Sequence, residues 1–445
     1  MSDVLDELTA WAAVLTGAPS VMLRQRSGGG RHQAWDVAAP NGETWFLRMD
    51  AVAPGAHEHY TLRREAGIYR AVHAAGIPSP AVLGIHPTLE AVLLERVDGD
   101  AAFARLAPAA QLAIIDDFAP LLARLHAADP ASMGLDALGA VTTIADAVMR
   151  ELDIWESRLD GTGVPDPFLT ACFRWLRANL PETGDTPPVL VQGDTGPGNF
   201  LHDGMRVTAF LDFELGHLGD PMEDLAWVGT RNAQEPVPDF ERFLDHYESA
   251  SGNPVDRERL RYHSLFAELR IAVLGAGRVA DDDAMAEHGN HMIYGALHRR
   301  LTVEALAVVL GVDVPTVELP VLTDTAATRY FDGVLAQLGT IVVPAISDPY
   351  AKRRAKSIAR TVKYLREADR AGDLPQQAEL DDLQALLGTR PTSVETGTAE
   401  LHARVVDDTV DAAAILRYAA GQAMRRQQLA ATAMGVLADQ HLPAI

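Results

Sequence analysis

The sequence has a single cysteine, Cys172, among its 445 residues. One thiol cannot form a disulfide within the chain, and a zinc site built from several cysteines is also excluded. No apolar run approaches the roughly 20 residues that a membrane-spanning helix needs, so we expect no membrane partner. The first residues, Met1 to Glu7, are acidic and lack the basic start of a secretory signal. These absences together predict a cytoplasmic protein.

Positive charge is also scarce, because 38 Lys and Arg stand against 61 Asp and Glu, for a net charge of −23. The excess is uneven: residues 316–445 carry −2 and the rest of the chain carries −21. An acidic surface repels the phosphate backbone, so we expect no nucleic-acid partner. The acidity suits a cationic substrate, although it serves solubility equally well.

The most informative segment is Val191-Gln-Gly-Asp-Thr-Gly-Pro-Gly-Asn-Phe200, followed by Leu211-Asp-Phe-Glu214. An apolar strand over 188–191 leads into a glycine-rich turn that presents Asp194. Asn199 follows five residues later, and a second apolar strand over 207–211 leads to Asp212. The order of residues and their strand context are those of a phosphotransferase active site.

Phosphoryl transfer from ATP needs a carboxylate to accept the proton of the attacking hydroxyl. It also needs oxygen ligands that hold Mg²⁺ against the phosphates. Asp194 is the predicted catalytic carboxylate, and Asn199 and Asp212 are the predicted metal ligands. Glu214 lies two residues after Asp212 and faces the same side of an extended segment; it either supports the metal or is a solvated carboxylate.

Hydrophobic periodicity divides the chain into a small mixed region and a long helical remainder. Residues 34–37 and 44–49 are predicted strands around the Pro40-Asn-Gly42 turn, and 91–97 is a predicted buried strand. A helix is expected over 57–75, and Pro and Gly residues mark the ends of the later segments. The further predicted helices are 111–127, 141–160, 166–180, 239–250, 257–280, 284–311, 323–345, 347–371, 375–388 and 397–440.

The two motifs resemble those of aminoglycoside phosphotransferase-like kinases. The continuation Leu215-Gly-His-Leu-Gly-Asp-Pro-Met-Glu-Asp-Leu-Ala-Trp227 is similar to the branch that includes kinase-like domains fused to some acyl-CoA dehydrogenases. The resemblance covers about residues 10–310. It implies an α+β, protein-kinase-like fold with two lobes: a small N-lobe built on an antiparallel sheet and a mostly helical C-lobe.

The resemblance also implies roles for residues outside the motifs. Arg48 takes the place of the kinase lysine that contacts the ATP phosphates, and Glu65 on the following helix pairs with it. The hinge that contacts the adenine edge corresponds to Glu95 through Val97. The loop over the nucleotide corresponds to Ser27, Gly28, Gly29 and Gly30.

One position departs from the family pattern, since Gln192 stands where the family usually has histidine. Glutamine still donates and accepts hydrogen bonds, so we expect it to organise the loop and activity to survive. Asp220 and Asp224 are interpreted as structural carboxylates that accept backbone N–H bonds and brace the catalytic loop, with substrate contact as the alternative. His126 is interpreted as a structural histidine at a helix end. The helix over 284–311 carries three histidines on one face, which indicate pocket lining or packing rather than a metal.

The predicted domains are the N-lobe (1–97), the C-lobe with the motifs (98–312) and an appended all-α domain (316–445), through which a homodimer is expected. The predicted function is transfer of phosphate from ATP, with Mg²⁺, to the hydroxyl of a small-molecule acceptor. A hydroxyacyl-CoA or related metabolite is the first acceptor class and an aminoglycoside the second. The other hypothesis is a nucleotide-binding pseudokinase that acts as a scaffold. The basic residues over 353–363 are interpreted as a solvated face, with a partner surface or CoA phosphate site as the alternatives.

Overall fold

The computed structural model describes residues 2–26, 33–50, 58–184, 186–279 and 286–444. Its contacts divide the chain into two compact units. Unit 1 consists of residues 1–147 and 183–256, and unit 2 consists of residues 148–182 and 257–445. The predicted three-part division of the chain remains a prediction. No helix among the described residues has the length and hydrophobicity needed to cross a membrane.

Unit 1 begins with a five-stranded antiparallel sheet in the order β1-β2-β3-β5-β4. The strands are β1 (Met22–Gln25), β2 (Gln33–Ala38), β3 (Thr44–Met49), β4 (Val82–Ile85) and β5 (Ala91–Glu95). The predicted Pro40-Asn-Gly42 turn is confirmed: it joins β2 to β3, with Trp35 opposite Leu47, and Gly42 has a φ of 92°. A positive φ of this kind favours glycine, which explains why this turn closes so tightly.

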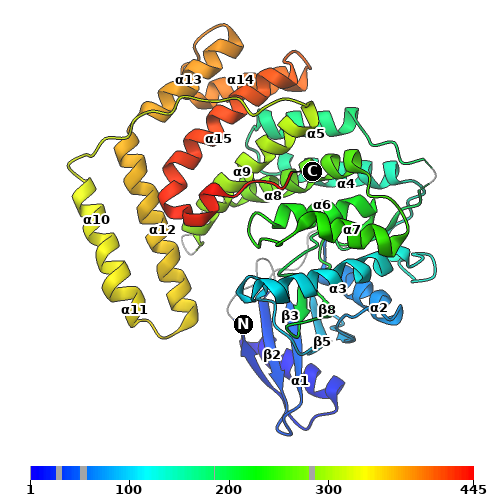
Figure 1. Ribbon diagram of the computed structural model, residues 1–445. Helices are drawn as coiled ribbons and strands as arrows, with labels where there is room; N and C mark the ends of the chain where they lie inside the picture. The colour runs from blue at the N-terminus through cyan, green and yellow to red at the C-terminus, as the bar shows by residue number, and fades with distance from the viewer. Residues whose placement is uncertain (1, 27–32, 51–57, 185, 280–285, 445) are drawn as a thin grey trace. The chain divides into compact units, whose positions relative to one another are not determined.

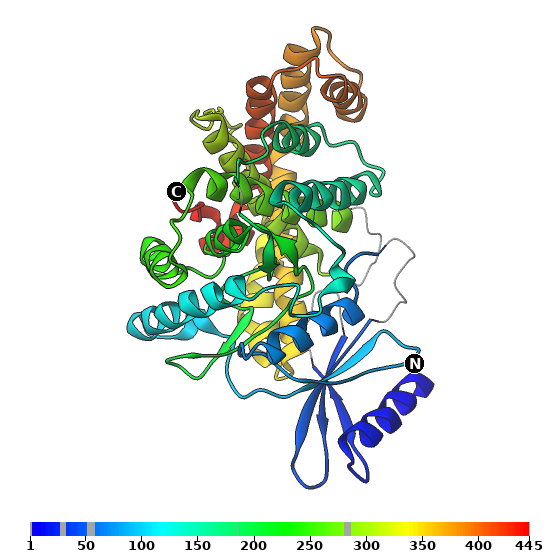
Figure 2. The same ribbon diagram turned by 90° about the vertical axis from the view of Figure 1, so that its right-hand side faces the viewer.

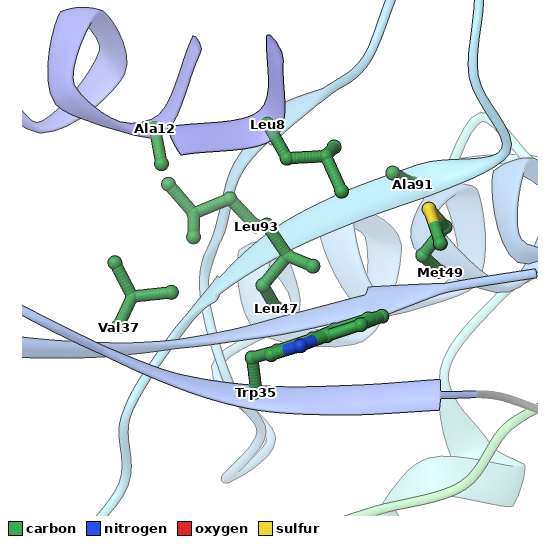
Figure 3. Close-up of a cluster of buried hydrophobic side chains, with 8 residues drawn as sticks. All are labelled: Leu8, Ala12, Trp35, Val37, Leu47, Met49, Ala91 and Leu93. Carbon is green, nitrogen blue, oxygen red and sulfur yellow. The ribbon is translucent and has the colours of Figure 1, made fainter. Parts of the chain in front are cut away.

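One face of the sheet is covered by α1 (Ser2–Thr16), as Figure 2 shows for the dark blue helix beside the strands. Leu8 of α1 packs in a buried cluster with Trp35, Leu47 and Leu93, which Figure 3 shows. Because strand side chains alternate between faces, Phe46 and Arg48 on β3 lie on the opposite face from Leu47. The core therefore fixes which face of the sheet is left for a ligand.

The helix α2 (Leu62–Ala74) contacts β4 and β5 and begins later than the predicted start at residue 57. Thr61 caps it by accepting a hydrogen bond from the backbone N–H of Arg64 at 3.2 Å. A capping residue keeps an extended backbone, so the helix cannot extend backward through Thr61. Residues 51–57 lie outside the described part of the chain.

The rest of unit 1 holds two short antiparallel ladders among helices. The β6 strand (Val189–Val191) pairs with β9 (His217–Gly219), and β7 (Phe200–His202) pairs with β8 (Val207–Phe210). Phe118 packs within 4.8 Å of the Phe200 ring centroid and 5.9 Å of that of Phe243. These aromatic contacts anchor the β7–β8 ladder to α3 (Pro108–Ala127) and α7 (Phe240–Ser251), while α6 (Pro221–Arg231) follows β9.

Unit 2 contains helices joined by loops and has no strand among its described residues. It contains most of α4 (Ile144–Asp160), and Cys172 is fully buried in α5 (Pro167–Ala178). The α9 helix (His288–Leu310) packs against α8 (Arg257–Val279), α12 (Pro349–Ala371) and α15 (Ala412–Met434), as Figure 1 shows. The remaining α-helices are α10 (Thr328–Gln337), α11 (Val343–Ala345), α13 (Leu374–Leu387) and α14 (Val394–Val406).

The prediction of one helix over 397–440 is wrong, because the chain breaks between α14 and α15. Asp408 adopts a φ of 57° in this break, and Asp411 then caps α15 by accepting from the Ala414 N–H at 2.8 Å. Aspartate favours caps and turns because its side chain bonds to nearby backbone groups. The helical periodicity on both sides concealed this turn.

Candidate active site

The loop after β6 is held by Asp224, which is completely buried near the start of α6. Its carboxylate accepts from the backbone N–H groups of Gln192 (2.8 Å) and Gly193 (2.9 Å) and from the Thr195 hydroxyl. His126 lies against the same carboxylate at 3.0 Å. A buried carboxylate needs several such partners, and here they fix the backbone of the loop. The structural interpretations of Asp224 and His126 are confirmed.

Gln192 performs the organising role that was expected in place of histidine. Its side chain is fully buried, and Nε2 donates to the backbone carbonyls of Asn199 (3.1 Å) and Leu211. One amide group thus joins the segments that carry Asn199 and Asp212. Gly193 next to it has a φ of 81°, and a Cβ there would lie 2.5 Å from the carbonyl oxygen of Leu215. Only glycine fits between these two segments.

Asp194 is held by two donors from different parts of unit 1. Its Oδ2 accepts from Asn199 Nδ2 at 2.8 Å, and its Oδ1 accepts from Arg231 Nη1 at 3.0 Å. Burial raises the pKa of Asp194 to about 6, although Arg231 and the Asn199 hydrogen bond favour the charged form. A carboxylate with this pKa is ionised at neutral pH and still accepts a proton readily, as a general base requires.

Arg231 was missed by the sequence analysis, which predicted no helix over 221–231. It lies at the last turn of α6, and its Nε donates to the Pro197 carbonyl at 3.0 Å. A Cβ at Gly196 would approach the Cδ of Arg231 to 3.1 Å, so the glycine-rich loop is shaped around this side chain. The signal that could have located it is Asp220-Pro221, an N-cap followed by proline. Asp220 accepts from the Met222 N–H at 2.9 Å, which confirms its structural role.

Asn199 and Asp212 line the same cavity. Because Nδ2 of Asn199 points to Asp194, its Oδ1 is the atom with ligand character. Asp212 has a φ of 60°, which is unusual for a residue other than glycine, and its backbone N–H donates to the Tyr69 hydroxyl at 2.7 Å. Strain of this kind concentrates at functional sites, where the surrounding contacts hold it in place. Glu214 lines the cavity as well.

Arg48 forms the centre of the charged end of the cavity. Its Nη1 lies 2.6 Å from Glu65, and its Nη2 lies 3.3 Å from Asp212. The Arg48 side chain is 14% exposed and that of Glu65 is 2% exposed, so this is a buried pair rather than a surface contact. The surrounding carboxylates raise the pKa of Arg48 above its ordinary value despite its burial. Its positive charge is therefore permanent.

The cavity has a volume of about 430 Å³, within the usual range for small-molecule sites. Glu95 and Val97 both line it, as do Arg48, Asn199 and Asp212. Apolar side chains from the sheet and from the β7–β8 region supply two walls that suit a flat ring, namely Ala34, Phe46, Leu94, Leu201 and Leu211. The predicted loop residues Ser27, Gly28, Gly29 and Gly30 lie outside the described part of the chain.

A divalent cation fits this donor set. Asn199 and Asp212 offer an amide oxygen and a carboxylate, the hard ligands that Mg²⁺ prefers. No group of three or more His, Cys, Asp or Glu side chains that could hold a metal occurs among the described residues. Mg²⁺ bound to nucleotide keeps phosphate and water ligands, so two protein ligands suffice for it.

The histidines of α9 and the basic face of α12 have structural roles within unit 2. His291 and His298 line a second cavity, which confirms the expectation of pocket lining or packing. Arg353 lies 3.1 Å from Glu287, and Arg360 donates to Asn290. These contacts join α12 to the beginning of α9, so the basic face is not wholly solvated.

Comparison with known proteins identifies this arrangement. Residues 23–263 match the family described as the phosphotransferase enzyme family, APH. The chain belongs to this family. Acyl-CoA dehydrogenase family member 11 of Gallus gallus is 27% identical over 223 residues, covering 47% of this chain and 28% of that protein. Acyl-CoA dehydrogenase family member 11 of Rattus norvegicus is 31% identical over 189 residues, covering 40% of this chain and 23% of that protein. The matches thus span about a quarter of these relatives' length.

Among solved structures, a Ralstonia eutropha protein provisionally assigned as an aminoglycoside phosphotransferase superposes with a TM-score of 0.54 at 20% identity. The superposition covers 69% of this chain and 99% of the Ralstonia eutropha chain. At this level of identity, the similarity establishes a shared fold. The predicted fold class is confirmed: the APH phosphotransferase has an antiparallel sheet followed by a mostly helical remainder with additional C-terminal helices.

Proposed function

We propose that this APH phosphotransferase is an ATP-dependent and Mg²⁺-dependent kinase that phosphorylates the hydroxyl of a small molecule. The observation that carries the proposal is the convergence of Arg48, Asn199 and Asp212 on one cavity, with Asp194 bonded to Asn199 beside it. If Asp194 were only a structural carboxylate, nothing would require it to lie beside Arg48, Asn199 and Asp212. Their types are those that ATP phosphates, Mg²⁺ and an acceptor hydroxyl require.

In this mechanism the adenine ring lies between the apolar walls, near Val97 of the hinge. Arg48 binds the phosphates, and Glu65 holds the guanidinium in place. Asn199 and Asp212 would hold Mg²⁺, which supplies charge neutralisation of the phosphates. Since the transition state is loose, this positioning contributes more than the strength of any base.

Asp194 orients the acceptor hydroxyl and accepts its proton late in the reaction. A new bond forms between the acceptor oxygen and the γ-phosphorus, while the bond between the γ-phosphorus and the bridging oxygen breaks. The electron pair leaves with ADP, and the proton stays on Asp194 until solvent removes it. Arg231 is a positioning residue here, because its contact with Oδ1 leaves Oδ2 on the side of Asn199.

The acceptor is proposed to be a hydroxylated acyl metabolite, such as a hydroxyacyl-CoA or a hydroxy acid. The support is the likeness to the acyl-CoA dehydrogenase family members. An aminoglycoside is the second candidate, favoured by the net charge of −23. Net charge says little about one pocket, so the family likeness receives more weight.

The experiment is Mg²⁺-dependent ADP release with a panel of hydroxyacyl-CoAs, hydroxy acids, sugars and aminoglycosides. Turnover with one class that disappears in Asp194→Asn, while a fluorescent ATP analogue still binds, would support the proposal. ATP binding without turnover on any acceptor would favour the pseudokinase scaffold. Failure of ATP to bind the wild-type protein would contradict both hypotheses.

A further inference from the structure

Unit 2 contains a second cavity, of about 560 Å³, that has no part in the proposed phosphoryl transfer. It is lined from five helices or their ends: α5, α8, α9, α12 and α15. Figure 1 shows α9, α12 and α15 side by side in this region. Most of its lining follows residue 263, where the family match ends.

Two glycines keep the cavity open. Gly275 on α8 and Gly295 on α9 both line it, and a Cβ added at either would meet no atom within 4 Å. Glycine inside a helix costs about 1 kcal/mol relative to alanine. Side chains at these two positions would therefore fit without steric conflict and would favour the helices, yet the space is left empty.

The polar part of the lining is cationic. Arg299 is 5% exposed, and both of its terminal nitrogens are engaged: Nη1 donates to Asp166 at 2.6 Å and Nη2 donates to Gln422 at 2.7 Å. Arg426 on α15 also lines the cavity, with an exposed side chain. Within the described part of the chain, its guanidinium makes no hydrogen bond or ion pair. Asp166 balances one of the two arginines, so the lining carries one excess positive charge.

The environment of Arg426 is short of negative charge. Its pKa lies below the ordinary arginine value, first because the protein atoms packed around this solvent-accessible side chain still desolvate its charge, and then because of the neighbouring Arg299; Asp166 and Glu379 offset this only in part. A guanidinium in such a place gains most from a ligand oxyanion that accepts hydrogen bonds in planar geometry. The other end of the lining is apolar, with Leu169, Ile271 and Met292 among its residues.

We infer that this cavity is a binding site for a small organic monoanion, a carboxylate with an apolar chain, whose carboxylate pairs with Arg426. One carboxylate matches the single excess charge, and the apolar chain fills the space beside Gly275 and Gly295. The inference does not depend on the proposed kinase activity, because the site lies in unit 2 and its ligand need not be phosphorylated.

The test is titration calorimetry of the full chain with sodium octanoate, compared with octan-1-ol and octylamine of the same chain length. Octanoate should bind saturably at one site, while the neutral and cationic analogues should not. Arg426→Met should weaken octanoate binding about tenfold or more, as expected for loss of one charge-assisted hydrogen bond. The matched control is Arg417→Met on the exposed face of the same helix, which should bind as the wild type does.

A second variant keeps the test decisive if Arg426→Met does not fold. Gly275→Leu should fold, because leucine is a better helix former and the space is open, and it should weaken octanoate binding by filling the apolar end. Absence of octanoate binding to the wild type would overturn the inference. So would equal affinity for octan-1-ol, unchanged binding in Gly275→Leu, or tighter binding of octyl phosphate than of octanoate.

Discussion

Replacement of Arg231 by glutamine isolates the charge that keeps the proposed catalytic base ionised. Arg231 Nη1 lies 3.0 Å from Asp194 Oδ1, and the two side chains are 22% and 25% exposed. An opposite charge at this range lowers a carboxyl pKa by about 1 to 3 units. Because the pair is partly solvated, we expect the variant to raise the Asp194 pKa by about 1.5 units. Burial, which already raises this pKa to about 6, would then act with less opposition.

The assay is the pH dependence of kcat/KM for ADP release, from pH 5.5 to 9. A base loses activity as it becomes protonated, so a higher pKa moves the acid limb of the profile to higher pH. At pH 6.5 the ionised fraction of Asp194 falls from about three quarters to about one tenth, a loss of roughly eightfold in kcat/KM. At pH 9 both proteins are ionised, and their rates should agree within about twofold.

The control is Arg242→Gln, which removes a comparable contact in the same unit, 2.6 Å from Asp116. Its profile should match that of the wild type, because Asp116 does not line the cavity that Arg48 and Asp212 line. An acid limb that stays in place in Arg231→Gln, or that moves to lower pH, would refute the assignment of Arg231 as the group that keeps Asp194 charged. A uniform loss at every pH would show instead that Arg231 acts through geometry.

Three further changes have definite expected outcomes. Asp194→Asn should stabilise the fold at pH 8 by about 1–3 kcal/mol. The raised pKa of Asp194 favours the folded state only when the pH lies below the pKa of the unfolded chain, and this advantage is lost as the pH rises through about 6. At pH 8 the ionised carboxylate therefore destabilises the fold, and the neutral amide does not. Melting curves at pH 8 and pH 4.5 check it, and a gain that does not shrink at pH 4.5 would contradict it. Glu65→Gln should raise the KM for ATP about tenfold or more by loosening Arg48, whereas Glu90→Gln should not; equal KM values would exclude Glu65 as an anchor. Asp224→Asn should lower stability by about 2–4 kcal/mol, measured by urea unfolding, because an amide cannot accept all of the bonds that the buried carboxylate accepts.

The proposed site could be located from sequence where strands deliver its residues. Asp194 and Asp212 follow short apolar strands, and strand ends are places where a fold presents side chains at fixed positions. Arg48 also came from a strand, although its role came from the family resemblance. Helix existence was predicted better than helix limits: α5 and α7 agree closely with expectation, whereas 397–440 is two helices.

The contacts that the sequence analysis missed depend on tertiary packing over long separations. Arg231 is 37 residues from Asp194, and only the capped turn at Asp220 places it against the loop. The Asp36 carboxylate, which lines the cavity and accepts from Arg26 and Arg96, was missed for the same reason. No local sequence pattern predicts these ion pairs, because their partners are distant in the sequence and come together only in the folded structure.

The buried state of Cys172 makes the wild-type chain a convenient background for site-specific spectroscopy. The thiol is fully buried in α5, and burial raises its pKa well above the ordinary value, so thiolate-directed reagents should leave it unmodified in the folded protein. Cysteines introduced on the surface, one in each compact unit, would then accept a donor and an acceptor dye without removal of the native residue. Energy transfer between them would measure the separation of the two units in solution, with and without nucleotide.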